Sequence, residues 1–241
     1  MDKRYAERVG LLVSILPYLD SEQRFALKGG TAINLFEHDL PRLSVDIDVT
    51  WLPTQDFDTD AHQIADALTA LAERLAAPPL KLLVRPSAAA GDRTLNRLIV
   101  SRGRTQVQIE TTPVMRGAVH PARRMNLRAS VERQFGSAQV QVLHFADLYA
   151  GKLAATLSRQ HPRDLFDIGV LFDTTGLEIE LWRTFLVYLT ASAKPAAEML
   201  QPSEPRNFAA VFNSQFRGMT REPVTVEWLL EGRARLRQKH A

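Results

Sequence analysis

The chain has 241 residues, of which 45% are hydrophobic and 24% are charged, a composition typical of a globular protein and unlike that of a disordered or fibrous one. It contains no cysteine, which excludes disulfides and thiolate metal sites. The formal net charge of +3 is too small to indicate a nucleic-acid partner by itself.

Residues 4–19 predict an amphipathic helix rather than a signal peptide, because Asp2, Glu7 and Arg8 interrupt the apolar runs at this end. No stretch approaches the roughly 20 apolar residues that a membrane span requires. We therefore expect a soluble, cytoplasmic protein without a membrane partner. Arginines cluster at residues 123–133 and 233–239, where they either bind phosphate or belong to solvated helix faces.

A glycine-rich segment follows the first predicted strand, residues 25–28, and precedes a short predicted helix, residues 32–37. Its residues are Gly29, Gly30 and Thr31. Glycines allow a close backbone approach, and free N–H groups at a helix start bind anionic phosphates. A simple turn with a helix cap explains the same tripeptide without any chemistry.

Residues 44–49, Ser-Val-Asp-Ile-Asp-Val, alternate polar and apolar side chains, the pattern of a strand with one apolar face. Asp46 and Asp48 then project from the same face, roughly 6–7 Å apart. Two carboxylates this close repel each other unless a cation or a proton lies between them, and their hard oxygens suit Mg²⁺ or Mn²⁺. Solvated surface acids are the alternative. A phosphate-binding turn followed by such a strand predicts the start of a nucleotidyltransferase domain.

The middle of the chain predicts a helix at residues 57–75 and strands at 81–85, 95–100, 105–110 and 139–143, with the second and third strands joined as a hairpin. Glu110 lies on the polar face of the hairpin's second strand. It is either a third metal ligand beside Asp46 and Asp48 or a surface glutamate of an edge strand. Residues 114–136 look irregular and basic, as in a flap that faces a substrate.

From residue 146 onward the apolar pattern is helical. We predict helices at 146–160, 162–173, 178–191, 206–214 and 225–239. The chain therefore belongs to the α/β (α+β) class, with an α/β domain at residues 1–143 and a helical domain at 144–241 that completes the active-site cleft.

A second group of charged residues lies at the start of this helical part. Lys152 and Arg159 are two helical turns apart on one face, and the small apolar neighbours of Lys152 allow another body to approach it closely. In the next helix Asp164 lies in the first turn, and Asp167 can pair with Arg163, orient Lys152 or contact the metal site. Helix capping and an intrahelical ion pair are the structural explanation, and for Asp164 this explanation is at least as good as a chemical role.

The combination of Gly29-Gly30-Thr31, Arg42-x-Ser44-x-Asp46-x-Asp48 and Lys152-x6-Arg159-x3-Arg163-Asp164-x2-Asp167 resembles the motifs of the AbiEii/AbiGii toxin family of nucleotidyltransferases. This family includes the MenT-type toxins of type IV toxin–antitoxin systems. The resemblance covers residues 27–168. It implies a polymerase-β-like nucleotidyltransferase domain with a mixed sheet, followed by an all-helical C-terminal domain.

The resemblance also implies roles for individual residues. Ser44 corresponds to a hydroxyl that some antitoxins of this group phosphorylate, and Leu153 stands where the family often has an aromatic residue. The implied catalytic residues are Asp46, Asp48, Lys152 and Asp167; the implied metal ligands are Asp46, Asp48 and Glu110; the implied nucleotide-binding residues are Gly29, Gly30, Thr31, Ser44, Lys152 and Arg163.

The implied function is a metal-dependent toxin that transfers NMP from an NTP to an RNA acceptor, the 3′ end of a tRNA, and so inhibits translation. A cognate antitoxin would be its partner. The alternatives are a transferase that modifies a protein or an antibiotic, a non-catalytic relative that binds RNA or a partner, and a metal-dependent nuclease. The intact acids and Lys152 argue against a non-catalytic relative, and a nuclease has no need of the glycine turn.

Overall fold

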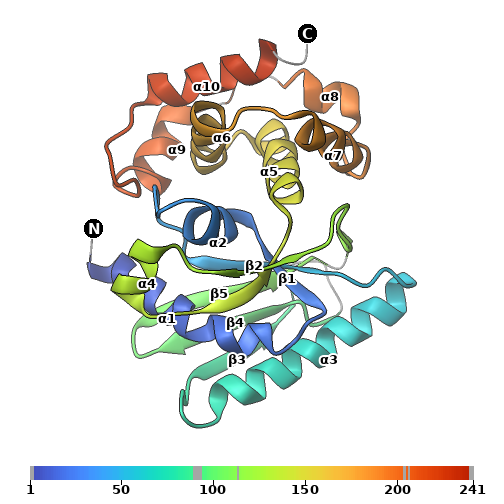
Figure 1. Ribbon diagram of the computed structural model, residues 1–241, viewed down its shortest axis with the longest axis vertical. Helices are drawn as coiled ribbons and strands as arrows, with labels where there is room; N and C mark the ends of the chain where they lie inside the picture. Colours follow the sequence, from blue (N-terminus) through green and yellow to red (C-terminus); the bar gives the residue numbers. More distant parts are fainter. Residues whose placement is uncertain (1–2, 89–93, 113, 203–204, 206, 239–241) are drawn as a thin grey trace. The chain divides into compact units, whose positions relative to one another are not determined.

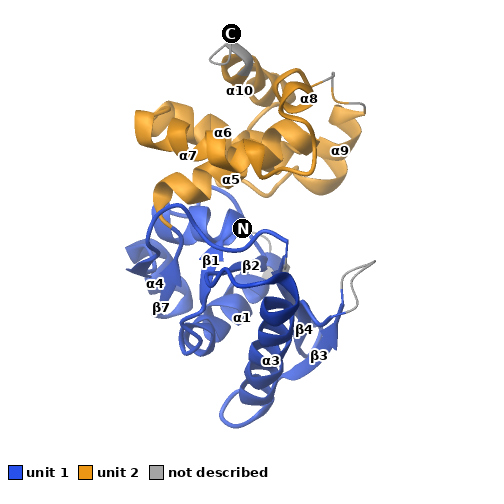
Figure 2. Ribbon diagram, turned by 90° about the vertical axis from the view of Figure 1, so that its right-hand side faces the viewer, with its two compact units in different colours: residues 1–143 blue, residues 144–241 orange. Residues whose placement is uncertain are grey.

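The computed structural model describes residues 3–88, 94–112, 114–202, 205 and 207–238, and the chain divides into two compact units, residues 1–143 and 144–241 (Figure 2). Each unit has its own buried apolar side chains. Residues 206 and 239, at the ends of two predicted helices, lie outside the described residues. Among the described helices, none combines the length and apolar character needed to cross a membrane.

Unit 1 is built on a seven-stranded sheet with the order β3-β4-β5-β2-β1-β7-β6 (Figure 1). The pairs β1–β7 and β2–β5 are parallel and the other neighbours are antiparallel, so the sheet is mixed. The central position of β2 places the Asp-x-Asp motif in the middle of the sheet. The strands are β1 (Phe25–Lys28), β2 (Asp46–Trp51), β3 (Leu83–Ser87), β4 (Arg97–Arg102), β5 (Thr105–Thr111), β6 (Arg123–Asn126) and β7 (Gln139–Val142).

Two long helices of unit 1, α1 and α3, pack against the sheet and against each other. The apolar stripe of α3 includes Ile64, Leu68 and Leu71, each fully buried, as its helical spacing predicts. Asp56 caps this helix by accepting a hydrogen bond from the backbone N–H of Thr59. The helices of the unit are α1 (Lys3–Asp20), α2 (Gly29–Ala32), the π-helical turn η1 (Ile33–Glu37), α3 (Phe57–Ala76) and α4 (Ala129–Phe135).

The prediction of an irregular segment at residues 114–136 agrees with the structure for residues 114–122 and is wrong after them, because β6 and α4 follow. The basic side chains of β6 are also not free for a substrate. Arg123 forms an ion pair with Glu37, and Arg124 forms one with Asp20. Strand β6 is formed by its antiparallel ladder with β7, and both acids lie far away in sequence, so neither partner leaves a local pattern.

Unit 2 is helical. Helix α5 packs against α6, α7 and α8, and α6 also packs against α9 and α10. Gly169 of α6 lies against the Trp228 ring of α10, since a Cβ at this glycine would lie 2.4 Å from the ring. The helices are α5 (Phe145–Arg159), α6 (Pro162–Thr174), α7 (Ile179–Thr190), α8 (Ala196–Leu200), α9 (Phe208–Gln215) and α10 (Val226–Gln238). The five-residue α8 was not predicted, because it is too short to show helical periodicity.

The C-terminal arginine cluster belongs to the packing of unit 2. Arg233 is buried and donates a hydrogen bond to the Gln160 side chain, and Arg235 pairs with Asp173 at 2.7 Å. Lys239 lies outside the described residues. Arg233 and Arg235 of this cluster therefore have structural partners of their own.

Candidate active site

The Asp-x-Asp motif opens strand β2. Ile47 and Val49 are fully buried, whereas Asp46 and Asp48 keep part of their surface exposed, so the two carboxylates share the face opposite the apolar one. The strand begins two residues later than the alternating pattern predicts, because Ser44 and Val45 precede the first ladder pair. The motif thus lies on a rigid central strand rather than on a loop.

Asp48 belongs to a row of four charged residues that crosses four neighbouring strands. It is opposite Lys28 on β1 and opposite Glu110 on β5, and Glu110 is opposite Arg97 on β4. Residues paired across strands project from the same face of a sheet. Arg97 Nη2 lies 3.3 Å from Glu110 Oε2, and the Gln108 amide also donates to Glu110. From β1 to β4 the charges along the row are positive at Lys28, negative at Asp48 and Glu110, and positive at Arg97.

Lys28 was not predicted as a site residue. Burial lowers the pKa of its ammonium below the ordinary value, and the charges of Asp48 and Glu110 oppose that effect. In the sequence it is a single lysine at a strand end, and only the antiparallel register of β1 and β2 brings it beside Asp48. The signal available in the sequence was its position directly before the glycine turn.

The glycine turn packs directly onto the acidic strand. Gly29 has a φ of +71°, and a Cβ there would lie 2.5 Å from Oδ2 of Asp48. A Cβ on Gly30 would lie 2.6 Å from Nη2 of Arg42 and 2.9 Å from Oγ of Ser44. Only glycine fits both positions without displacing these side chains. The two segments identified from the sequence therefore form one local structure.

Thr31 does not lie at the start of the helix, where the sequence places it. The helix begins at Gly29, with Lys28 as a cap that makes no side-chain hydrogen bond. The Thr31 side chain is fully buried, and its hydroxyl donates to the backbone carbonyl of Asp46 at 2.5 Å and lies 3.0 Å from the Ser44 hydroxyl. Its side chain thus ties α2 to the first residue of the acidic motif.

The chemistry of Asp46 and Asp48 fits a divalent cation. Both are partly buried carboxylates on one strand face, and hard oxygen donors suit Mg²⁺ or Mn²⁺. Glu110 lies next to them in register, but its carboxylate is bound by Arg97 and Gln108. Within the described residues, the carboxylate oxygens of these three acids do not all approach within 4.8 Å of one another. Asp46 and Asp48 are therefore better supported as metal ligands than Glu110 is.

In unit 2, Lys152 is held between two buried acids. Its Nζ lies 3.0 Å from Oδ1 of Asp164 and 3.0 Å from Oδ2 of Asp167, and the exposure of all three side chains is 7% or less. The structure therefore brings together Lys152 and Asp167, two of the predicted catalytic residues. It also shows Asp167 beside Lys152, the orienting contact that the spacing allows.

Asp164 joins Lys152 to Arg159, whose Nε and Nη2 donate to the Asp164 carboxylate at 2.6 and 3.0 Å. Burial alone would raise the pKa of this carboxyl, but the charge of Lys152 and the Arg159 hydrogen bonds hold it well below its ordinary value. Asp164 is thus more than a helix cap. Arg163 is half-buried, and its backbone N–H donates to the ring of His161, which caps α6.

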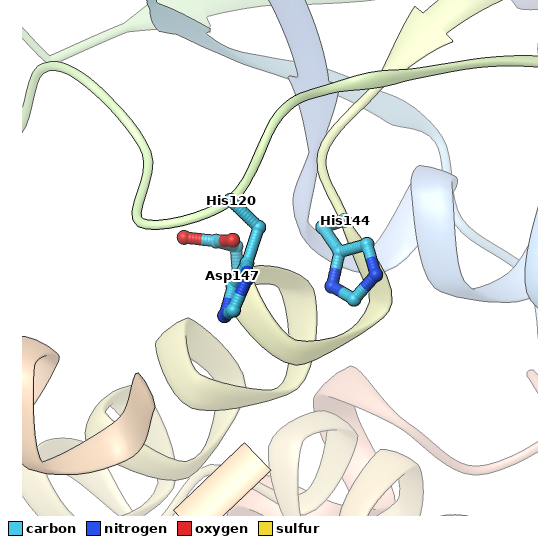
Figure 3. A group of neighbouring side chains, drawn as sticks. All are labelled: His120, His144 and Asp147. Atoms are coloured by element: carbon cyan, nitrogen blue, oxygen red, sulfur yellow. The ribbon is translucent and has the colours of Figure 1, made fainter. Parts of the chain in front are cut away.

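The small residues around Lys152 have a partner within unit 2. A Cβ on Gly151 would lie 3.5 Å from the Tyr188 ring, so the glycine next to Lys152 packs against α7. His144 precedes α5 as its N-cap, and Asp147 lies in the first turn of the helix (Figure 3). His144 caps the helix through the backbone N–H of Ala146, and Asp147 accepts a hydrogen bond of 3.0 Å from the Tyr188 hydroxyl.

Comparison with known proteins identifies the fold and the family. The family model described as "Nucleotidyl transferase AbiEii toxin, Type IV TA system" matches residues 10–232. The solved structure of MenT4, a nucleotidyltransferase toxin from Mycobacterium tuberculosis H37Rv, superposes with a TM-score of 0.66 at 19% sequence identity, covering 98% of this chain and 83% of that one. The search of curated proteins found no match.

The structural similarity confirms the predicted fold class, in which a mixed α/β sheet domain precedes helices. The family match extends over most of the chain and confirms the predicted enzyme class, a nucleotidyltransferase. The chain belongs to the AbiEii family of nucleotidyltransferase toxins of type IV toxin–antitoxin systems.

Proposed function

We propose that the protein transfers NMP from an NTP to an RNA acceptor, the 3′ end of a tRNA, and that this modification inhibits translation. The observation that carries the proposal is the contact between the glycine turn and the acidic strand, where Gly29 lies against Asp48. A turn suited to phosphates and a carboxylate pair suited to a cation are thereby neighbours. The family supports the transfer chemistry, and the tRNA acceptor rests on the resemblance to the MenT-type toxins.

The metal ligands in this proposal are Asp46 and Asp48, and Glu110 joins them once its side chain leaves Arg97. A divalent cation bound there would supply Lewis-acid activation and neutralise phosphate charge during transfer. The backbone of residues 29–31 would bind phosphate oxygens. The short hydrogen bond from Thr31 would keep Asp46 in place.

Lys152 is proposed to contact the triphosphate, with Arg163 as a second cation and Asp167 as an essential acid. Lys152 is paired with two carboxylates in the structure, and its ammonium has three N–H donors, so a phosphate would bind the third donor or replace one carboxylate. Ser44 is the proposed position of antitoxin-dependent control, since a phosphate on its hydroxyl would collide with Gly30 and with the Thr31 hydroxyl. The proposed partner is therefore a cognate antitoxin.

The test is an incubation of the purified chain with Mg²⁺, each of the four α-labelled NTPs and total tRNA. We expect labelled RNA from the wild type and none from Asp46→Asn or Asp48→Asn. Asp66→Asn is the matched control, because Asp66 is an exposed acid on α3. Its activity should equal that of the wild type.

The acceptor is decided in the same reaction by adding a cell extract. Label in the tRNA fraction supports the proposal, and digestion from the 3′ end should release it. Label in protein or in a small molecule would reassign the acceptor while keeping the transferase. Equal, background-level labelling by the wild type and Asp46→Asn with every NTP and RNA would refute the catalytic proposal.

A further inference from the structure

The charged row on the sheet contains a cation that the proposed mechanism does not use. Lys28 ends β1 and lies opposite Asp48, one of the proposed metal ligands. Arg97, at the other end of the row, already forms an ion pair with Glu110. Lys28 is thus the cation placed beside the carboxylates that would bind a metal.

We propose that Lys28 is the resident counter-ion of the acidic site, which neutralises Asp48 when no metal is bound and weakens the affinity of the site for a divalent cation. The inference rests on the proposed function in one respect, the assignment of Asp46 and Asp48 as metal ligands. It adds a positioning residue that no motif assigns. Its position is fixed by the ladder of β1 and β2 and by Gly29, which packs on the same carboxylate.

The positive charge of Lys28 affects the binding of nucleotide as well as the binding of metal. The acids Asp46, Asp48 and Glu110 attract a cation, and the positive charge of Lys28 beside Asp48 opposes its binding. A bound divalent cation would add two positive charges to the site, and the Lys28 charge would add to their attraction for an anionic triphosphate. Lys28 therefore lowers metal affinity and raises nucleotide affinity, and these opposite signs separate its role from that of a purely structural lysine.

The experiment measures Mn²⁺ binding to the full-length chain without nucleotide, by electron paramagnetic resonance of the free ion. We expect Lys28→Met to bind Mn²⁺ about fivefold more tightly than the wild type, because a like charge near the ion has been removed. Lys28→Arg keeps the charge and should remain within about twofold of the wild type. Lys81→Met removes one positive charge from an exposed position of the same unit and should leave the affinity unchanged.

Nucleotide binding provides the second readout. In saturating Mn²⁺, the KM for the NTP should rise about fivefold in Lys28→Met and stay near the wild-type value in Lys28→Arg. Circular dichroism checks that each variant is folded. If Lys28→Met does not fold, Lys28→Gln is measured in the same way with the same expectation.

The outcomes separate the inference from the function on which it rests. If Asp48→Asn abolishes Mn²⁺ binding while Lys28→Met leaves it unchanged or weaker, the counter-ion role is refuted and the proposed metal site stands. If Asp46→Asn and Asp48→Asn bind Mn²⁺ as well as the wild type, or the wild type binds none at millimolar concentration, both the metal site and the inference fail.

Discussion

Gly29 and Asp48 are in such close contact that no side chain larger than hydrogen fits between them: a Cβ on Gly29 would lie 2.5 Å from Oδ2 of Asp48 and 3.1 Å from its Cβ. Gly29 also has a φ of +71°. The glycine turn and the acidic strand are therefore one structural unit, and a change in the turn displaces the carboxylate.

Gly29→Ala should lose nucleotide-transfer activity and stability together. The positive φ costs about 1–2 kcal/mol for a non-glycine residue, and displacement of Asp48 adds a further cost of about 1–3 kcal/mol. Urea unfolding and the labelling assay measure the two effects. Gly103→Ala is the matched control, because Gly103 has a φ of +60° but a Cβ added there would meet nothing within 4 Å. A loss of stability no larger than that of Gly103→Ala would contradict the proposed contact.

The elements around the site were predictable because their signals are local. The alternation around Ile47 and Val49 predicts β2, and the apolar stripe of α3 predicts a long helix; both agree with the structure. The contact between the glycine turn and Asp48 was not predictable, because it depends on the antiparallel register of β1 and β2.

Strand β6 and the surroundings of Lys152 depend on tertiary partners that the sequence does not show. Strand β6 forms an antiparallel ladder with β7, and its arginines pair with Glu37 and Asp20, which are distant in sequence. The Lys152 ammonium is held by Asp164 and Asp167 of the next helix, and only the packing of α5 against α6 brings both acids to it. In both cases the sequence shows the residue type correctly, and the tertiary partner decides what the residue contacts.

Asp164→Asn should destabilise the chain by about 3 kcal/mol at pH 7, because it leaves the buried Lys152 with one carboxylate fewer. Asp173→Asn on the same helix is the control. Its ion pair with Arg235 is 40–47% exposed, and its loss should cost less than about 1 kcal/mol. Urea unfolding of the two variants measures the difference, and equal costs would contradict a buried Asp164 network.

The contribution of Asp164 to the stability of the fold should decrease as the pH falls. The native-state pKa of this carboxyl is lowered, so the unfolded state takes up its proton first as the pH falls. The stability that Asp164 contributes is complete above pH 5 and decreases below the unfolded-state pKa of about 4. The difference between wild type and Asp164→Asn should therefore narrow from pH 5 to pH 3, by up to about 1.4 kcal/mol per pH unit. A constant difference over this range would show that the carboxyl is not stabilised as an anion.

Asp60→Ala should be among the most destabilising substitutions in unit 1, at about 3–5 kcal/mol. The Asp60 side chain is fully buried, accepts a hydrogen bond of 3.1 Å from the Trp51 indole and lies 3.0 Å from Nε of Arg116. Asp60→Asn keeps an acceptor for Trp51 but loses the charge and the acceptor for the Gln55 N–H, since its amide NH2 faces Gln55 and Arg116. Its cost should still be smaller than that of Asp60→Ala. Thermal unfolding followed by tryptophan fluorescence tests the order, and a reversal would mean that the indole contact contributes little.

Thr31→Val should reduce activity more than stability. The substitution preserves the volume of this buried side chain but removes its hydroxyl, which donates to the backbone carbonyl of Asp46 at 2.5 Å. Loss of one such bond costs about 1–2 kcal/mol of stability. A small displacement of Asp46 lowers the transfer rate by about tenfold or more, because the reaction depends on the positions of the cation ligands.

Thr31→Ser is the control, since it retains the hydroxyl and should keep most of the activity despite a similar cost in stability. Steady-state labelling with saturating NTP, compared with urea unfolding, separates the two effects. Equal activity of the valine and serine variants would show that the hydrogen bond does not position Asp46.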